Sequence, residues 1–307
     1  METKVMSIPV PHLCVVTAAD IEFNAITRQL KECSFAHSEG IRICQGRAGR
    51  NQITVLQSQI GAGRFGEKLT GHLSETKYDA LLVLGLAGAL SPELKTGDVI
   101  FYDTCFVFRP EFATTTEGDQ TLQSDGTAVC DFPLASSLRR MLVEAGWHCV
   151  FGTGLTLDFM VTKAQEKLAM GESYGAAAVD MESYDILDIC TRLSLPAIVM
   201  RVIIDEAKQT TPDFNLAITA DGKMNNLKSC LAMMLRPLAA VRFLLSLWKA
   251  MNALRKVAKL TLSTGQEIER SSSALVLVRT QKDTYKPEPD SPADPTPPAR
   301  SKSHYYC

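Results

Sequence analysis

The stretch DALLVLGLAGALSPELKTGDVI, residues 79–100, decides the fold of this chain. Its first half is almost wholly apolar, which is typical of a central strand in a parallel sheet that is covered on both faces. Glycines at positions 85 and 88 lie near the end of this strand and leave room for a flat ligand. A short polar turn follows before the apolar pattern returns. We therefore expect a buried strand that ends at a ligand site.

Apolar strands alternate with helical segments on both sides of this stretch. We expect further strands over residues 12–18, 53–60, 97–108 (as a strand pair), 148–161 and 196–207. We expect helices over residues 20–31, 64–75, 136–147 and 181–193. Strands that alternate with helices indicate a sheet covered on both faces. The predicted fold is therefore α/β, with three α/β/α layers around a mixed, mostly parallel central sheet.

The C-terminal part of the chain differs in character. Residues 226–254 predict an apolar helix, interrupted or started afresh near Pro237. Charged residues divide its apolar run, which stays shorter than the ~18 residues that a membrane-spanning helix needs. We assign residues 1–259 to one domain that includes this helix. Residues 260–307 contain a proline-rich segment with few apolar residues, and we predict a low-order tail there.

Composition excludes several classes of protein. The formal net charge of the 307 residues is −2, which argues against nucleic-acid binding through bulk electrostatics. The nine cysteines have no C-x-x-C spacing and suggest no zinc site, so we predict neither a metal nor another cofactor. Residues 1–13 contain no apolar signal core, and we expect a cytoplasmic protein.

Gly61, Gly63 and Gly66 spell G-x-G-x-x-G between a predicted strand and a predicted helix. A dinucleotide-binding loop has this pattern, but it also needs an acid at the end of the next strand to bind ribose hydroxyls. The next strand ends at Leu90 without such an acid. The alternative is a tight turn in which the glycines let the helix pack close to the strand, and we favour this turn.

Three acidic residues lie at the ends of apolar strands. Glu22 follows the first strand, Glu182 begins a helix after the segment GAAAVDM, and Asp205 ends the segment AIVMRVII. Ligands of open α/β sheets bind outside the carboxyl ends of the strands. A single acid in such a position is commonly a helix cap. Three acids at one edge of a sheet instead indicate an active site.

Five blocks of sequence, in the right order, resemble the purine nucleoside phosphorylase and methylthioadenosine/S-adenosylhomocysteine nucleosidase superfamily over roughly residues 12–254. The blocks are CVVTAADIEFNAI, SQIGAGRFG, VLGLAGALSPELKTGDVI, AVDMESYDILDIC and VMRVIIDEA. In this superfamily the glycine loop is a strand-to-helix turn, so the resemblance agrees with our interpretation of the loop. It also implies a homo-oligomer, such as a dimer, that buries the rim of the active site.

The resemblance implies a role for each residue of the site. Asp205 would act as the catalytic acid that serves the purine, and Glu22 would activate water. The substrate would be held by a ribose-binding pair and by residues around the base: Glu182, Met181, Phe159, Met160, Ala87 and Gly88. Burial in an apolar strand would raise the pKa of Asp205, so that it could hold a proton for the leaving base near neutral pH.

The sequence departs from the pattern of the superfamily in three places. Ile204 stands where the family has a serine that steers the catalytic aspartate. Val83 and Leu86 stand where phosphorolytic members place an arginine and a serine for phosphate. We therefore favour water over phosphate as the nucleophile, although Arg64 in the glycine loop keeps phosphorolysis open.

Three hypotheses of function follow. The first is hydrolysis of a purine nucleoside such as methylthioadenosine or S-adenosylhomocysteine, as in methionine salvage. The second is cleavage of an adenosylated lipid, because the C-terminal part also resembles the hopanoid-associated phosphorylase-like branch. Residues 230–259 would then form a basic amphipathic helix on the inner face of a membrane, instead of a helix packed on the domain. The third is a nucleoside-binding domain without turnover, which Ile204 and Leu86 favour but which the presence of Glu22, Glu182 and Asp205 together opposes.

Overall fold

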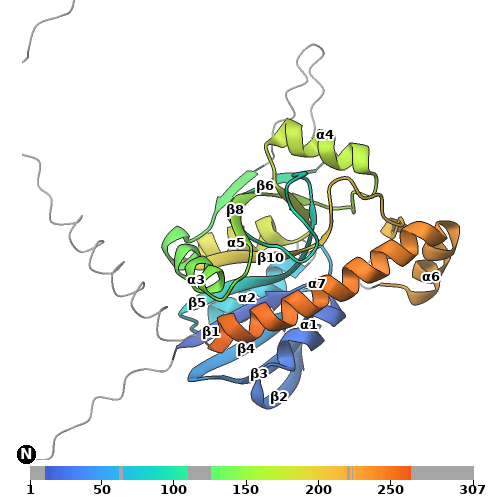
Figure 1. Ribbon diagram of the computed structural model, residues 1–307. Coiled ribbons are helices and arrows are strands. Elements are labelled where there is room, and N and C mark those ends of the chain that lie inside the picture. Colours follow the sequence, from blue (N-terminus) through green and yellow to red (C-terminus); the bar gives the residue numbers. More distant parts are fainter. Residues whose placement is uncertain (1–10, 62–64, 110–125, 220–221, 223, 264–307) are drawn as a thin grey trace, which may run out of the picture.

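The computed structural model describes residues 11–61, 65–109, 126–219, 222 and 224–263. The tail predicted beyond residue 260 thus lies almost wholly outside the described residues. The strands are β1 His12–Thr17, β2 Lys31–Ser38, β3 Ile41–Ala48, β4 Asn51–Gln57, β5 Ala80–Ala89, β6 Val99–Phe108, β7 Gly126–Val129, β8 Cys149–Leu157, β9 Ala178–Asp180 and β10 Ala197–Asp205 (Figure 1). The helices are α1 Asp20–Thr27, α2 Gly66–Glu75, α3 Phe132–Glu144, α4 Ala164–Tyr174, α5 Ser183–Arg192, α6 Asn226–Leu235 and α7 Pro237–Ser263.

The described strands form one ten-stranded sheet in the order β10-β6-β8-β9-β5-β1-β4-β3-β2, with β7 beside β6. Because β10 also pairs with β5, the strands β5, β9, β8, β6 and β10 close into a ring. Parallel pairs join β5 to β1 and β10, β1 to β4, and β8 to β6 and β9. The remaining pairs are antiparallel. The predicted α/β fold with a mixed sheet is confirmed.

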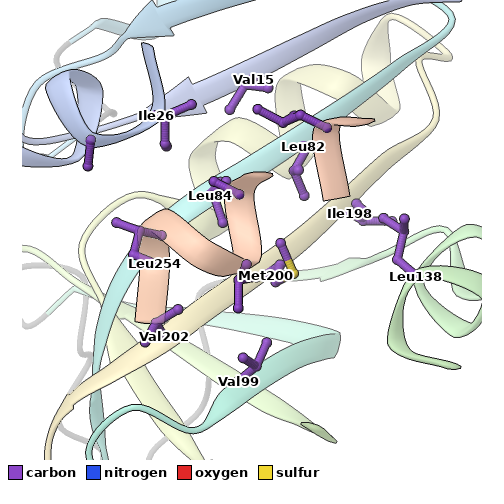
Figure 2. Packing of buried hydrophobic residues seen from close by; sticks show 14 of the residues in the cluster. Val15, Ile26, Leu82, Leu84, Val99, Leu138, Ile198, Met200, Val202 and Leu254 are labelled. Atoms are coloured by element: carbon purple, nitrogen blue, oxygen red, sulfur yellow. The ribbon is translucent and has the colours of Figure 1, made fainter. Parts of the chain in front are cut away.

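Helices cover both faces of the central strands. Successive side chains of β5 point to opposite faces, as strand geometry requires. Leu82 and Leu84 belong to a cluster with α1, α3 and α7, where Leu254 of α7 packs onto the sheet (Figure 2). Leu81 and Val83 belong to a second cluster with α2 and α5. The nearly unbroken apolar run of β5 is therefore buried on both sides, and the three layers follow from it.

Some elements differ from the sequence-based prediction. The helix predicted over residues 20–31 ends at Thr27, and residues 31–48 form the β2–β3 hairpin. The sequence did not signal this hairpin because every residue of β2 is exposed and no apolar alternation marks it. The strand pair predicted over residues 97–108 is a single strand, β6. Helix α4 was also missed, since its only buried residue is a lysine, Lys167, and its apolar residues Leu168, Met170 and Tyr174 are only partly buried against the core.

The predicted C-terminal helix is two helices that meet at Pro237. Proline lacks the N–H that a helix interior needs, but it suits a first helical position. The second of these helices, α7, continues past the predicted end to Ser263, and the side chain of Asn51 donates a 2.8 Å hydrogen bond to the carbonyl of Leu262. Among the helices that the structure describes, none combines the length and the apolar character needed to cross a membrane.

Candidate active site

A pocket of about 170 Å³ lies at the carboxyl ends of β1, β5 and β10, beside the loop after β8 and the start of α5. This is the edge at which open α/β sheets bind ligands. All the site residues predicted from the sequence line the pocket: Asp205, Glu22, Glu182, Met181, Phe159, Met160, Ala87 and Gly88. The fold thus brings together side chains from distant parts of the chain, and what each of them does remains a prediction.

Glu22 lies in the first turn of α1, and its carboxylate turns back toward the sheet. One oxygen, Oε2, accepts hydrogen bonds from the backbone N–H groups of Ala18 (3.1 Å) and Ala19 (3.0 Å). The other, Oε1, accepts a 2.7 Å hydrogen bond from the backbone N–H of Leu86 in β5. The side chain is buried, with 4% of the residue exposed. These backbone donors fix the carboxylate in one position at the pocket wall.

Glu182 immediately precedes α5, and its side chain lines the pocket. Its Oε1 accepts a hydrogen bond from the backbone N–H of Gly61 at 3.2 Å, and its Oε2 lies 3.3 Å from the guanidinium of Arg201. Burial raises the pKa of Glu182 to about 7, while Arg201 opposes this shift and the carboxylates of Asp180 and Glu22 add to it. The Glu182 carboxyl group therefore exchanges its proton near neutral pH.

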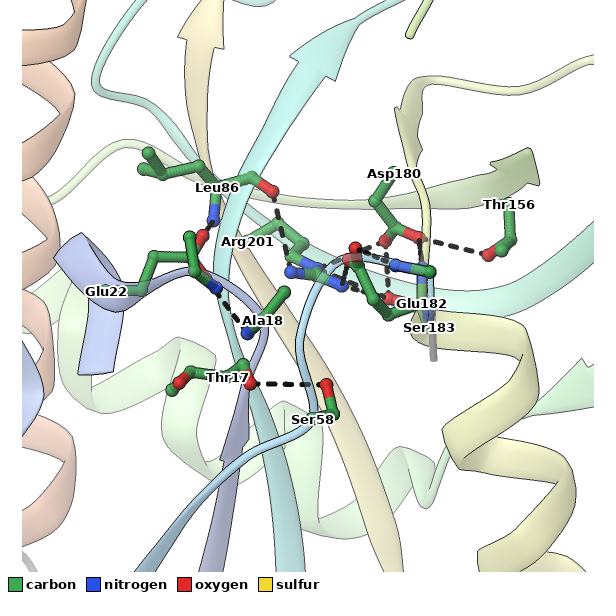
Figure 3. A network of polar contacts seen from close by, with 12 residues as sticks. Thr17, Ala18, Glu22, Ser58, Leu86, Thr156, Asp180, Glu182, Ser183 and Arg201 are labelled. Atoms are coloured by element: carbon green, nitrogen blue, oxygen red, sulfur yellow. Dashed lines mark hydrogen bonds and ion pairs between the residues drawn. The ribbon is translucent and has the colours of Figure 1, made fainter. Parts of the chain in front are cut away.

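Arg201 and Asp180 form a buried ion pair behind Glu182 (Figure 3). The Nε atom of Arg201 lies 3.1 Å from Oδ2 of Asp180, and both side chains are only 1% exposed. Asp180 also accepts hydrogen bonds from the backbone N–H groups of Glu182 (3.1 Å) and Ser183 (3.0 Å). Burial alone would lower the pKa of Arg201, but the two carboxylates outweigh it and raise that pKa. The pair holds the start of α5 against the sheet.

Sequence reasoning assigned no role to Arg201 or Asp180. The signal for Arg201 was present, because a cation inside the apolar run IVMRVII has to find a buried partner. The sequence did not reveal which acid this partner would be. Asp180 stands only two residues before Glu182 and was treated as part of the strand that leads to it.

Asp205 ends β10, and its carboxyl group meets a buried lysine from α4. Lys167 is fully buried and donates to Oδ2 of Asp205, and also to the carbonyl oxygens of Glu206 (3.5 Å) and Gln209 (3.0 Å). Burial raises the pKa of Asp205, and Lys167 opposes this shift. Nothing in the sequence pointed to Lys167, because its helix carries no apolar pattern that would have placed it.

Apolar side chains form the wall between these acids. Phe159 and Met160 belong to the loop after β8, and Ile204 stands across the pocket from them on β10. The side chain of Asn215 holds this loop through two hydrogen bonds to the backbone of Met160. Its Oδ1 accepts the backbone N–H of Met160 at 2.7 Å, and its Nδ2 donates to the carbonyl of the same residue at 3.0 Å. A flat aromatic ligand would meet an apolar surface here.

A second, larger cleft of about 780 Å³ adjoins the pocket. The two cavities share the lining residues Ala18, Ala19 and Ile60. From there the cleft extends to Met224 and Asn226, where α6 begins. A ligand bound in the pocket could therefore extend a substituent toward α6.

The glycine loop serves this site. Gly61 has a φ of +80°, which favours glycine, and its N–H binds Glu182. Gly63 and Arg64 lie outside the described residues, so the phosphate role considered for Arg64 stays a prediction. Of the two positions considered for phosphate, Val83 is buried in the apolar core, and Leu86 gives its N–H to Glu22. Within the described part of the chain, no group of three or more His, Cys, Asp or Glu residues could hold a metal ion.

Solved structures share this fold at low sequence identity. Futalosine hydrolase of Helicobacter pylori is 18% identical, with a TM-score of 0.62 over 82% of this chain and 97% of that one. A methylthioadenosine/S-adenosylhomocysteine nucleosidase from Neisseria meningitidis, in complex with methylthio-immucillin-A, is 17% identical, with a TM-score of 0.63 over 83% and 100%. An S-adenosylhomocysteine nucleosidase from Streptococcus pyogenes is 18% identical, with a TM-score of 0.63 over 84% and 98%.

The sequence itself also matches a family. The match extends over residues 12–239, from the first strand of the sheet into α7, and includes every residue that lines the candidate pocket. The fold and the order of the sequence blocks agree with it. The chain belongs to the phosphorylase superfamily.

Proposed function

We propose that this protein cleaves the N-glycosidic bond of a purine nucleoside, with water as the nucleophile. The observation that carries the proposal is the meeting of three carboxyl side chains, those of Glu22, Glu182 and Asp205, around one pocket. An adenine nucleoside with a 5′ substituent, such as methylthioadenosine or S-adenosylhomocysteine, is the proposed substrate. Its 5′ substituent would extend into the adjoining cleft of about 780 Å³.

Asp205 would supply a proton to the leaving base. A purine departs as a neutral molecule when its ring nitrogen N7 gains a proton as the glycosidic bond breaks. Asp205 is 7% exposed, and burial raises the pKa of its carboxyl group, which favours the protonated form that can donate. A well-placed general acid accelerates a reaction by roughly 10²–10⁴-fold.

Glu182 and Glu22 would act on the sugar and on water. Bond cleavage leaves positive charge on the ribose, and the Glu182 carboxylate would bind the ribose hydroxyls and stabilise this charge. Glu22, held by three backbone N–H groups, would orient a water molecule and take its proton. Phe159 and Met160 would provide the apolar surface for the base.

Water is the proposed nucleophile because the positions considered for phosphate carry apolar side chains. Val83 is buried between strands and helices, and the backbone N–H of Leu86 is already occupied by Glu22. An anion as large as phosphate needs several donors at one point. Neither of these positions offers a free donor for it.

The test is release of free base, followed by chromatography, with methylthioadenosine, S-adenosylhomocysteine, adenosine and inosine, each with and without phosphate. Adenine released without phosphate supports the proposal. Release that depends on phosphate would make the protein a phosphorylase and would bring Arg64 into the mechanism. If no nucleoside is cleaved but one binds, the protein is a nucleoside-binding domain and the hydrolase proposal is wrong.

A second candidate function, cleavage of an adenosylated lipid at a membrane surface, is favoured by one outer face of the molecule. We call it the α6–α7 face; it consists of exposed apolar side chains of α6 and the first half of α7: Leu227, Leu231, Met234, Leu235, Leu238, Val241, Leu244, Leu245 and Trp248. An exposed apolar patch on this scale is uncommon on a monomer and marks an interaction surface.

The charge of the α6–α7 face favours an anionic bilayer as its partner. Residues 224–263 contain no aspartate or glutamate, and four exposed cations lie among the apolar side chains of this face: Lys228, Arg236, Arg242 and Lys249. Apolar side chains interleaved with Lys and Arg are typical of helices that lie in the headgroup region of anionic membranes. We therefore propose that the α6–α7 face contacts the inner face of the membrane. The cleft that ends at Asn226 would open beside that surface. Of the segment 230–259 predicted for this contact, the part after Lys249 is largely buried against the sheet, as a helix packed on the domain would be.

Vesicle flotation tests this contact. We expect the protein to float with vesicles that contain phosphatidylglycerol and not with phosphatidylcholine alone. Leu238→Ser with Leu245→Ser should abolish flotation, whereas Val143→Ser, an exposed apolar residue of α3, should not. Light scattering decides the alternative occupant. If the parent protein does not float and the double variant dissociates an oligomer, the face joins copies of the chain and the membrane proposal is wrong.

Light scattering also tests the oligomeric state of the protein. We propose a cytoplasmic homo-oligomer, with a dimer as the simplest form. A single species of twice the chain mass of 33.6 kDa would support the dimer. A monomer that hydrolyses nucleoside at full rate would contradict it.

A further inference from the structure

Lys167 of α4 is fully buried, whereas most lysines lie at the protein surface. It is the only buried residue of α4, and each of its ammonium N–H donors has an acceptor: Oδ2 of Asp205 and the carbonyl oxygens of Glu206 and Gln209. A buried lysine is costly unless it is paired and fully hydrogen-bonded. Its acceptors come from the strand end that carries Asp205 and from the turn that follows. The structure of this turn is therefore organised around the lysine.

The two oxygens of Asp205 have different surroundings. Oδ2 accepts a hydrogen bond from Lys167. Both oxygens lie near Gly88 at the pocket wall, where a Cβ added to that glycine would lie 3.4 Å from Oδ1 and 3.7 Å from Oδ2. Among the described residues, no hydrogen bond holds Oδ1. Since Lys167 holds Oδ2, Oδ1 is the oxygen that remains available to a ligand in the pocket.

No other side chain does this for Asp205. The residue before it, Ile204, is apolar and offers no donor. The charged neighbours on both elements are occupied elsewhere. Glu206 pairs with Lys95 at 3.1 Å, and Glu166 of α4 pairs with Lys163 on the exposed side of the helix at 2.7 Å. Lys167 is thus the one cation that faces Asp205 within the described residues.

We propose that Lys167 is a positioning residue for Asp205, one that holds Oδ2 so that Oδ1 presents its proton to the leaving base and that stabilises the carboxylate formed afterwards. This inference rests on the proposed function. In the step concerned, the O–H bond of Asp205 breaks and an N–H bond forms at the purine. The electron pair of the glycosidic bond stays with the base. Lys167 keeps its own proton throughout and remains an ammonium ion opposite the new carboxylate.

The proposal predicts that loss of the cation weakens Asp205 as an acid. In Lys167→Met, the pKa of Asp205 should rise above its value in the parent, because the opposing effect of Lys167 is removed. This is measured without substrate, from the carbon-13 shift of the Asp205 carboxyl group against pH, with Asp205→Asn to assign the signal. Lys163→Met, which removes an exposed lysine of the same helix region, should leave the titration unchanged.

The rate effect should depend on the leaving group. With an adenine nucleoside, kcat/KM of Lys167→Met should fall by about 10²-fold, the lower range for loss of general-acid catalysis. With a nitrophenyl riboside, whose leaving group departs without a proton, kcat/KM should change little. A purely structural role would lower both rates together. Lys167→Arg, which keeps the charge, should restore the titration and part of the rate.

The outcomes separate this inference from the proposed function. If the parent cleaves no nucleoside, the proposed function is wrong, while the carboxyl titration still decides whether Lys167 controls Asp205. If the pKa of Asp205 is the same in Lys167→Met and the parent, or if both substrates slow down equally, the inference is overturned. Should the methionine variant fail to fold, Lys167→Gln, which keeps a donor without the charge, replaces it in the same measurements.

Discussion

The carboxylate of Glu22 accepts the backbone N–H of Leu86 at 2.7 Å, and this hydrogen bond joins α1 to β5 inside the pocket. The approach is close because the residue before Leu86 is a glycine. A Cβ added to Gly85 would lie 2.7 Å from Oε1 of Glu22 and 2.7 Å from Nη1 of Arg201. Both groups are buried and held by hydrogen bonds, so neither can move away.

We therefore expect Gly85→Ala to damage both stability and activity. The added methyl group has to displace the Glu22 carboxylate or the Arg201 guanidinium, and overpacking of this kind costs about 1–3 kcal/mol. Urea unfolding measures the loss, and base release measures the activity. Gly71→Ala is the control. That glycine lies in α2 with open space around it, and alanine should stabilise the helix by about 0.5–1 kcal/mol. Equal stability of the two variants would contradict the packing argument.

Glu22→Gln tests the proposed water base. Glutamine has the same shape but cannot take a proton from water, so kcat should fall by roughly 10²–10⁴-fold while nucleoside affinity stays close to that of the parent. Base release gives kcat, and calorimetry with a nucleoside analogue gives affinity. Glu144→Gln, at an exposed position of α3, should behave like the parent. A Glu22→Gln variant with parental kcat would remove Glu22 from the mechanism.

Glu182 should make activity depend on pH. Burial raises its pKa to about 7, and the proposed ribose contact needs the carboxylate. We expect kcat/KM to fall as the pH is lowered through about 7, since the protonated form gains population there. A pH–rate profile of the parent measures this limb. If kcat/KM stays level down to pH 5, the contact does not require the ionised form.

The raised pKa of Glu182 also makes the free energy of unfolding depend on pH, and it fixes the direction of that dependence. Between pH 4.5, the ordinary pKa of a glutamate, and about 7, the folded protein binds the Glu182 proton more tightly than the unfolded chain does. The stability that this proton contributes is complete below pH 4.5 and is lost as the pH rises to about 7. The free energy of unfolding of the parent should therefore decrease relative to Glu182→Gln across this window. A constant difference between the two proteins would contradict the raised pKa.

Removal of the buried cation behind Glu182 should be severe. Arg201→Met leaves the carboxylates of Asp180 and Glu182 buried without their counter-charge, which costs about 3–5 kcal/mol when one partner of a buried pair is lost. Arg192→Met is the matched control, since its pair with Asp188 is exposed and should be worth less than about 1 kcal/mol. Urea unfolding of both variants measures the difference. A similar loss of stability in both variants would show that the buried ion pair contributes no more to stability than the exposed one.

The sequence predicted the parts of the site that leave a periodic signal. The apolar run of β5 indicated a strand buried on two faces, and acids at the ends of apolar strands indicated a sheet edge with Glu22 and Asp205 on it. The partners of those acids leave no such signal. Lys167 is the only buried residue of α4, and nothing in the sequence connects this residue with Asp205, 38 positions away. The first strand of the β2–β3 hairpin was missed for a similar reason, since every residue of β2 is exposed and no apolar alternation marks it.

The long helix α7 has a consequence for how the chain is made. Its second half belongs to the main apolar cluster, which also contains Val15 of β1 and Met200 of β10 (Figure 2). The hydrogen bond from Asn51 to Leu262 joins residues 211 positions apart. Ribosomes supply these residues last among the described ones, so the part of this apolar face that α7 covers stays open until α7 has emerged. Apolar surface that is exposed during folding favours aggregation.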